Sequence, residues 1–371
     1  MKRQTIPLLS AVPGTQHSIT ALHFGEPGRG PKAMIQAALH ADEVPAILVA
    51  QRLRELLLTE EAAGRVQGEV VLVPYANPLG LNQVVLGQHQ GRFDLRDGIN
   101  FNRNVSDLTD AVTAALEGLL GDDLVRNTQL VRQALRDAAS ALVAKDPVTD
   151  LKNQLLKLAV DSDIVLDMHC DSQAAMHLYA LTPQADLAVE LGCLLGAKAI
   201  LLATESGDSP FDEACSRPWY QLQQRFAQHQ LPLGCFSTTL ELRGQADTHH
   251  ELAQRDAQAI VEFLRRRGVL SGPVGALPAA LCQPTPLAGS EPVTAPRAGV
   301  VIFHVEAGER VNAGQAIADL VDADTGEVLT VCAASSGVLY ARVATRWASH
   351  GQRLAKIAGT TLARTGKLLS S

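Results

Sequence analysis

The stretch Ala37-Ala38-Leu39-His40-Ala41-Asp42-Glu43 lies at the junction of two predicted elements. The apolar run from Ala33 to Leu39 predicts a buried strand, and Val44 to Leu58 predicts an amphipathic helix. Open α/β sheets carry their chemistry at such strand ends. His40 and Glu43 could therefore supply two of the three protein ligands of a catalytic zinc ion. For this stretch alone, the alternative is a solvated loop with an acidic residue at a helix N-terminus.

The composition is that of an ordinary globular protein. A chain of 371 residues with 46% hydrophobic content can bury a large core and predicts two or three domains. The charges, 32 Lys and Arg against 39 Asp and Glu, are scattered, and aromatic residues make up only 4%, which argues against a nucleic-acid partner. The sequence shows no secretion signal and no run of about 18 apolar residues, so we expect a cytoplasmic protein without a membrane partner.

The cysteine pattern indicates reduced thiols. Six cysteines lie far apart with no CxxC pair, which argues against a disulfide framework. Cys170 follows a histidine of interest, but we interpret it as a small apolar core residue and not as a nucleophile.

A second histidine also ends a predicted strand. The segment from Ile164 to His169 is short and apolar, as is the run before His40, so His169 is the natural third zinc ligand. Asp167 lies two residues earlier on the same face of the strand. It could orient a histidine ligand or bind neighbouring backbone.

Glu241 lies inside the β-rich segment Phe236 to Leu242. A carboxylate in an apolar strand is costly unless it is paired or functional. Beside a metal-bound water it would suit a general base. The alternatives are pairing with Arg243 or exposure to solvent.

The loop from Gly91 to Asn104 is polar and rich in arginine and asparagine. Forked guanidinium groups and amides suit recognition of a substrate carboxylate. An ordinary surface loop is the alternative for this segment taken alone.

Strand and helix patterns alternate through the first 270 residues, which predicts an α/β sheet flanked by helices. Residues 106–160 predict a helical insertion. The stretch 271–292 holds five prolines and predicts a linker, and residues 293–371 read as a small all-β domain.

The turn pattern from Val311 to Ile317 resembles the biotinyl/lipoyl hammerhead. The turn in which such carriers present a modifiable lysine, Val321 to Gly326, has no lysine here. We therefore predict that no prosthetic group is attached and that this domain caps the first one.

Four ordered motifs together resemble one known family over roughly the full chain. They are His40-Ala41-Asp42-Glu43, Asn102-Arg103, Asp167-Met168-His169 and Thr239-Leu240-Glu241-Leu242. The chain is similar to the succinylglutamate desuccinylase/aspartoacylase family, a branch of the zinc carboxypeptidase superfamily. The resemblance implies a zinc-carboxypeptidase-like mixed sheet and one zinc ion per chain.

The resemblance also implies roles for single residues. His40, Glu43 and His169 would hold zinc, and Glu241 would act as general base. Asn102 and Arg103 would bind the substrate carboxylate.

The family's carbonyl-polarising arginine lies shortly before the Asn-Arg pair, where this chain has both Arg92 and Arg96. We prefer Arg92, because Asp97-Gly98 then falls in the family register, and we keep Arg96 as a substrate-binding candidate.

The expected reaction is hydrolysis of the amide bond of a small N-acyl amino acid or a related carboxylate. The alternatives are a metallocarboxypeptidase that acts on peptides and a non-catalytic binding protein on the same fold. The helical insertion could shape an entrance to the site or a contact in a homo-oligomer.

Overall fold

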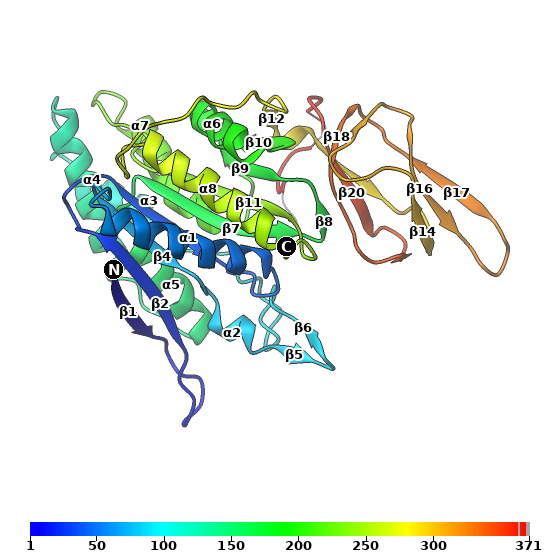
Figure 1. The fold of residues 1–371 in the computed structure, drawn as a ribbon, viewed down its shortest axis with the longest axis horizontal. Helices are drawn as coiled ribbons and strands as arrows, with labels where there is room; N and C mark the ends of the chain where they lie inside the picture. The colour runs from blue at the N-terminus through cyan, green and yellow to red at the C-terminus, as the bar shows by residue number, and fades with distance from the viewer. Residues whose placement is uncertain (363, 369–371) are drawn as a thin grey trace.

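The computed structural model describes residues 1–362 and 364–368 (Figure 1). In this part of the chain, nine strands form a mixed sheet whose central strands β4, β3, β7 and β11 run parallel. In sheet order the strands are β1 (Lys2–Pro7), β2 (Ser18–Gly25), β4 (Glu69–Val73), β3 (Lys32–Ala37), β7 (Ile164–Asp171), β11 (Phe236–Gly244), β9 (His177–Leu181), β10 (Ala199–Ala203) and β12 (Thr285–Pro286).

Helices cover both faces of this sheet (Figure 1). Alternate residues of β3 show the division: Ile35 packs into the core beneath one helical layer, and Met34 packs into the core beneath the other. The first layer contains α1 (Pro45–Ala62), α6 (Ala185–Leu195) and α8 (His250–Arg266). The second contains α3 (Thr109–Leu116), α4 (Leu124–Ser140), α5 (Pro147–Ala159) and α7 (Phe211–Arg225).

The predicted helical insertion corresponds to α3, α4 and α5. Two aspartates fix where the longer helices begin. Asp123 accepts hydrogen bonds from the first backbone N–H groups of α4, and Asp146 does the same for α5, whose first residue is Pro147. Shorter elements, α2 (Pro78–Leu81) and the hairpin of β5 (Val84–Val85) and β6 (Gln88–His89), follow β4.

The segment predicted as a linker also contributes to the sheets. Thr285 and Pro286 form β12, which pairs with β10 at the edge of the large sheet, where a proline is tolerated. A 3₁₀ turn, η2 (Leu287–Gly289), leads into β13, which begins at Ser290. A second such turn, η1 (Thr182–Gln184), precedes α6.

The C-terminal region is all-β, as predicted. Its described part has two antiparallel sheets around a separate apolar core. One contains β13 (Ser290–Thr294), β20 (Arg353–Ala358), β18 (Gly337–Arg342) and β15 (Arg310–Val311). The other contains β17 (Val328–Cys332), β16 (Ala316–Val321), β14 (Gly299–Phe303) and β19 (Trp347–Ala348).

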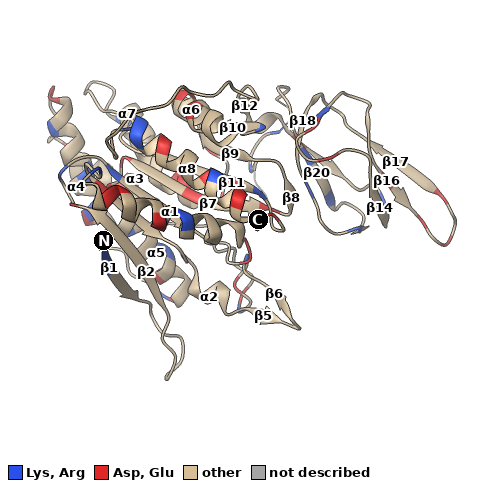
Figure 2. Ribbon diagram, viewed as in Figure 1, with Lys and Arg blue, Asp and Glu red and all other residues tan. Residues whose placement is uncertain are grey.

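The two parts of the chain share a sheet. β8 (Gln173–Ala174), which follows β7 directly, pairs with β18 of the C-terminal region. Figure 2 shows acidic and basic residues interspersed over the ribbon, as their scatter in the sequence suggests. Among the described residues, no helix has both the length and the apolar character needed to cross a bilayer.

Candidate metal centre

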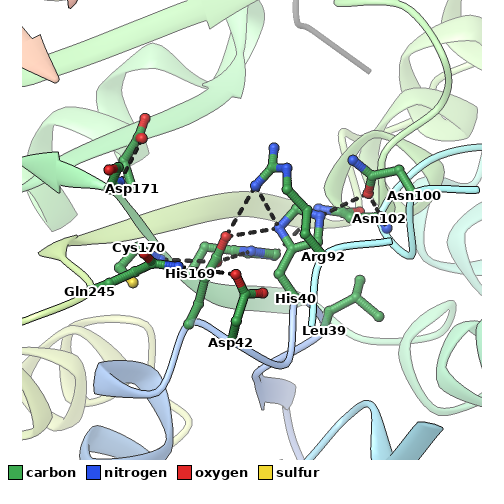
Figure 3. Close-up of polar contacts among 12 residues, drawn as sticks. Leu39, His40, Asp42, Arg92, Asn100, Asn102, His169, Cys170, Asp171 and Gln245 are labelled. Atoms are coloured by element: carbon green, nitrogen blue, oxygen red, sulfur yellow. Dashed lines mark hydrogen bonds and ion pairs between the residues drawn. The ribbon is translucent and has the colours of Figure 1, made fainter. Parts of the chain in front are cut away.

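His40, Glu43 and His169 meet at the ends of β3 and β7 (Figure 3 shows both histidines). Each offers one ligand atom, and these atoms lie within 4.8 Å of one another. All three side chains are buried. The sequence-predicted ligand set therefore forms one cluster that could hold a metal ion.

Glu43 bridges the two rings. Its Oε1 lies 2.9 Å from His40 Nδ1, and its Oε2 lies 2.7 Å from His169 Nδ1. The other nitrogen of each ring faces an oxygen acceptor: His40 Nε2 lies 2.8 Å from Asn100 Oδ1, and His169 Nε2 lies 2.9 Å from Asp167 Oδ2.

Because an oxygen acceptor requires a proton on Nε2, each neutral ring presents an unprotonated Nδ1 to the carboxylate. In that protonation state, a cation could accept both Nδ1 lone pairs together with the carboxylate. Two imidazole nitrogens and one carboxylate are a donor set that zinc accepts, so the residues present fit this ion.

The charges at the cluster are strongly coupled. Burial would raise the pKa of Glu43, but the two histidines hold it well below its usual value. Burial, helped by the Arg92 guanidinium, lowers the pKa of His40 to about 4. Burial also acts against a proton on His169, but Asp167 and Glu43 outweigh it and raise the pKa of that ring. Glu43 is therefore ionised at neutral pH.

The turn that presents His40 is held by close backbone contacts. Ala38 has a φ of 60°, a left-handed conformation that is strained for a non-glycine residue. Ala41 N donates to Gly91 O at 2.9 Å, and a Cβ on Gly91 would lie 2.0 Å from Asp42 N. Only glycine fits there, so the polar loop lies directly against the turn.

This close approach brings Arg92 to the centre. Its Nη1 lies 3.2 Å from Glu43 Oε1 and 3.2 Å from His40 Nδ1 (Figure 3). Arg96 does not reach the centre, because its guanidinium is held 2.5 Å from Asp94 Oδ2 and its side chain is 48% exposed. The expected role of Arg96 in substrate binding is therefore not supported.

Glu241 lies next to the metal centre. Register pairs it with His169 across β11 and β7, which places both side chains on one face of the sheet. Its Oε2 has no hydrogen-bond partner in the described chain, and Arg243 forms an ion pair with Asp256 instead. Burial, with the nearby charge of Glu43, raises the pKa of Glu241 to about 8. A cation bound at the centre would favour its ionised form.

Asn102 and Arg103 also reach the pocket. Asn102 Oδ1 accepts from Phe211 N at 2.8 Å, and its Nδ2 lies 3.3 Å from His169 Nε2. Arg103 Nη1 donates to Asn102 O at 2.7 Å. Lys152 on α5, which the sequence did not single out, donates to Arg103 O at 2.6 Å and supports this segment from behind.

The pocket extends from the metal centre to the C-terminal region, and its volume is about 950 Å³ including the space open to solvent. From the C-terminal region, Tyr340, Arg353, Lys356 and Arg364 line the pocket. Lys356 Nζ lies 2.6 Å from Asp171 Oδ2, which joins β20 to the end of β7. No local sequence signal marks these residues, because they reach the pocket only through tertiary contacts.

The interpretation of the cysteines agrees with the structure, which also shows how His177 is held. Cys170 is buried, and burial raises the pKa of its thiol, as expected of an unreactive core residue. The described cysteines are all free. His177 is buried against Tyr340 and lies 2.8 Å from Ala175 O, which is a structural role.

Solved structures with the same architecture include two Shewanella proteins described as members of the succinylglutamate desuccinylase/aspartoacylase family. The S. amazonensis protein is 26% identical, with a TM-score of 0.85 over 96% of this chain and 98% of its own. The S. frigidimarina protein is 24% identical, with a TM-score of 0.87 over 96% and 97%. The product-bound ectoine utilization protein EutE (DoeB) from Ruegeria pomeroyi is 16% identical, with a TM-score of 0.65 over 97% and 95%.

No curated protein matches the chain in sequence. The model of the succinylglutamate desuccinylase/aspartoacylase catalytic domain matches residues 29–267, which is more than half of the chain and includes the three candidate ligands and Glu241. The chain belongs to the succinylglutamate desuccinylase/aspartoacylase family.

Proposed function

We propose that this protein is a zinc-dependent amidohydrolase that removes the acyl group from a small N-acyl amino acid or a related carboxylate. The proposal rests on the buried cluster of His40, Glu43 and His169 and on the neighbouring Glu241, whose Oε2 has no hydrogen-bond partner among the described residues; all but Glu43 line one pocket. Membership of a family of hydrolytic deacylases supports the reaction class.

His40 and His169, through Nδ1, and Glu43 would hold the ion. A bound zinc ion would lower the pKa of a coordinated water and polarise the substrate carbonyl. Asn100 Oδ1, and the Asp167 carboxylate through its ion-pair contact, would favour protons on the Nε2 atoms of His40 and His169 and so leave each Nδ1 available as a ligand.

Glu241 would accept the proton of the attacking water. As the new C–O bond forms and the C–N bond breaks, the same carboxyl group would return the proton to the departing amine. Its position across from His169, without a competing hydrogen-bond partner on Oε2, leaves it available for both transfers.

Two arginines would stabilise the negative charges of the substrate and of the reaction. Arg92 Nη1 lies beside the ligand cluster and could donate to the oxyanion that develops on the carbonyl oxygen. Arg103, supported by Asn102, would bind the substrate carboxylate with its forked donors.

The C-terminal wall supports a small substrate. Residues from both parts of the chain line one pocket, so a bound molecule would contact the catalytic residues and Tyr340 together. A long peptide would need an open groove at this wall. This favours deacylation of small molecules over carboxypeptidase activity.

The test is amine release from N-acetyl, N-succinyl and N-formyl amino acids and from short peptides, with zinc-loaded protein. We expect release from one acyl class, a loss of turnover by about 10²-fold or more in Glu241→Gln, and no loss in the exposed control Glu251→Gln. Arg103→Ala should mainly raise KM. Equal activity in all these variants would overturn the assignment.

A further inference from the structure

One wall of the pocket is acidic. Asp212 and Glu213 lie in the first turn of α7, and Ser206 lies in the loop before it; all three line the pocket. Their exposed fractions are 6%, 9% and 2%, so this wall is built from buried polar groups. Neither the metal centre nor the proposed reaction uses them.

Two atoms of this wall have no hydrogen-bond partner in the described part of the chain. Glu213 Oε1 accepts from Ser206 N at 2.7 Å, which fixes the two residues together. Glu213 Oε2 and Ser206 Oγ form no hydrogen bond with any described residue. Buried polar atoms that face a pocket without partners indicate a ligand that completes them.

Two basic side chains near this wall form ion pairs with other acids. Arg217 pairs with Asp107 at 2.5 Å and with Glu205 at 3.3 Å. Lys367 pairs with Asp208 at 2.6 Å.

Arg103 is close enough to interact with both Asp212 and Glu213. In the proposed reaction, however, its charge is matched by the substrate carboxylate. When Arg103 binds that carboxylate, its charge no longer balances Asp212 and Glu213. A second positive charge from the ligand would then stabilise these two buried carboxyl groups. Burial raises the pKa of Asp212 to about 7, and it raises the pKa of Glu213 even though Ser206 and the charge of Arg217 act against this.

We propose that Ser206, Asp212 and Glu213 form a subsite for a cationic amino group, so that the substrate is an N-acyl amino acid with a basic side chain. An ammonium group has three N–H donors, and the wall offers a hydroxyl oxygen and two carboxyl groups as acceptors. This inference rests on the proposed function, because it takes Arg103 as the partner of the substrate carboxylate.

The basic residues that line the pocket make the competing prediction. Arg353, Lys356 and Arg364 line the pocket from the C-terminal region, and they would favour a substrate with an acidic side chain. Lys356 is already paired with Asp171. The charge preference of the enzyme therefore distinguishes the two walls.

The experiment compares three Nα-acetyl amino acids that differ in side-chain charge: acetylornithine, acetylnorvaline and acetylglutamate. With zinc-loaded protein we expect kcat/KM for acetylornithine to exceed that for acetylnorvaline by about tenfold or more, as for a buried charge-assisted contact. Glu213→Gln should reduce this ratio towards one. Gln can still accept from Ser206 N, so the loop should remain folded.

Glu205→Gln is the matched control, because Glu205 lies in the same loop but its side chain is 64% exposed. It should keep both the activity and the ratio. A preference for acetylglutamate, or equal use of acetylornithine and acetylnorvaline, would overturn the subsite.

Calorimetric titration with free ornithine, norvaline and glutamate separates this inference from the proposed function. Hydrolysis of none of the acetyl compounds would count against the function alone. Ornithine that binds more tightly than norvaline to wild type, but not to Glu213→Gln, would still support the subsite. Ornithine that binds no better than norvaline would refute it.

Discussion

Asp167→Asn should weaken zinc binding without unfolding the protein. Asp167 is fully buried, its Oδ2 lies 2.9 Å from His169 Nε2, and its Oδ1 accepts from Gln36 Nε2 at 2.9 Å. Asparagine keeps the shape but removes the charge. Gln36 Oε1 has no described partner, so the Gln36 amide can turn and accept from the new NH₂ group.

The magnitude follows from the loss of the carboxylate charge at this contact. A carboxylate that holds the remote N–H of a ligating histidine fixes its tautomer and increases the basicity of the ligand nitrogen. Loss of such a partner weakens metal affinity by about 10–100-fold, or about 1.4–2.7 kcal/mol.

Competition with a chromophoric chelator at neutral pH measures this affinity. Asp171→Asn is the matched control, because it makes the same change two residues after His169 at a carboxylate that pairs with Lys356. It should weaken zinc binding less than Asp167→Asn does. Circular dichroism of both metal-free variants would show whether the fold persists. Wild-type affinity in folded Asp167→Asn would refute the view that His169 binds the ion through Nδ1 with its tautomer set by Asp167.

Three further measurements examine the surroundings of the centre. Lys152→Met removes the lysine donor from two buried carbonyls, of which Asn100 O keeps Arg103 N as a donor. We therefore expect unfolding to become easier by about 1–3 kcal/mol and KM to rise more than kcat falls. An unchanged KM would show that this lysine does not position the loop of Arg103. Lys356→Met leaves the largely buried Asp171 carboxylate without its ion-pair partner and should lower the free energy of unfolding, measured by chemical denaturation, by about 3 kcal/mol. The double variant with Asp171→Asn should recover most of this stability. Losses of the two single variants that add up in the double variant would contradict the pairing. Burial lowers the pKa of His177 to about 4, so between pH 6.5 and 4 only the unfolded chain binds the proton, and the free energy of unfolding falls as the pH falls. In His177→Gln, roughly 3 kcal/mol of this decrease in stability at low pH should be absent. Parallel curves of stability against pH for the two proteins would exclude this role of His177.

The sequence is most informative where chemistry coincides with strand ends. His40 and His169 each follow an apolar run, and Glu241 interrupts one, so the hydrophobic pattern alone marks all three as candidates. Parallel pairing of β3, β7 and β11 then brings them together.

The remaining residues depend on contacts between distant segments. Arg92 and Arg96 lie in the same polar loop, and only the close approach of Gly91 to the turn decides which one reaches the metal centre. Lys152 and Lys356 lie in segments with ordinary helix and strand patterns, so nothing local distinguishes them from surface lysines. Similarly, nothing in a proline-rich stretch predicts the pairing of β12 with β10.

The pairing of β8 with β18 bears on the order of synthesis. During synthesis, the metal ligands and Glu241 leave the ribosome well before β18 and β20 do. The strand β8, which follows β7 and His169, can pair only after β18 has been made. A translation product that stopped before residue 337 would carry every ligand but lack the wall formed by Tyr340 and Lys356. The part of substrate selection that depends on this wall would thus begin only after the C-terminal strands have been made.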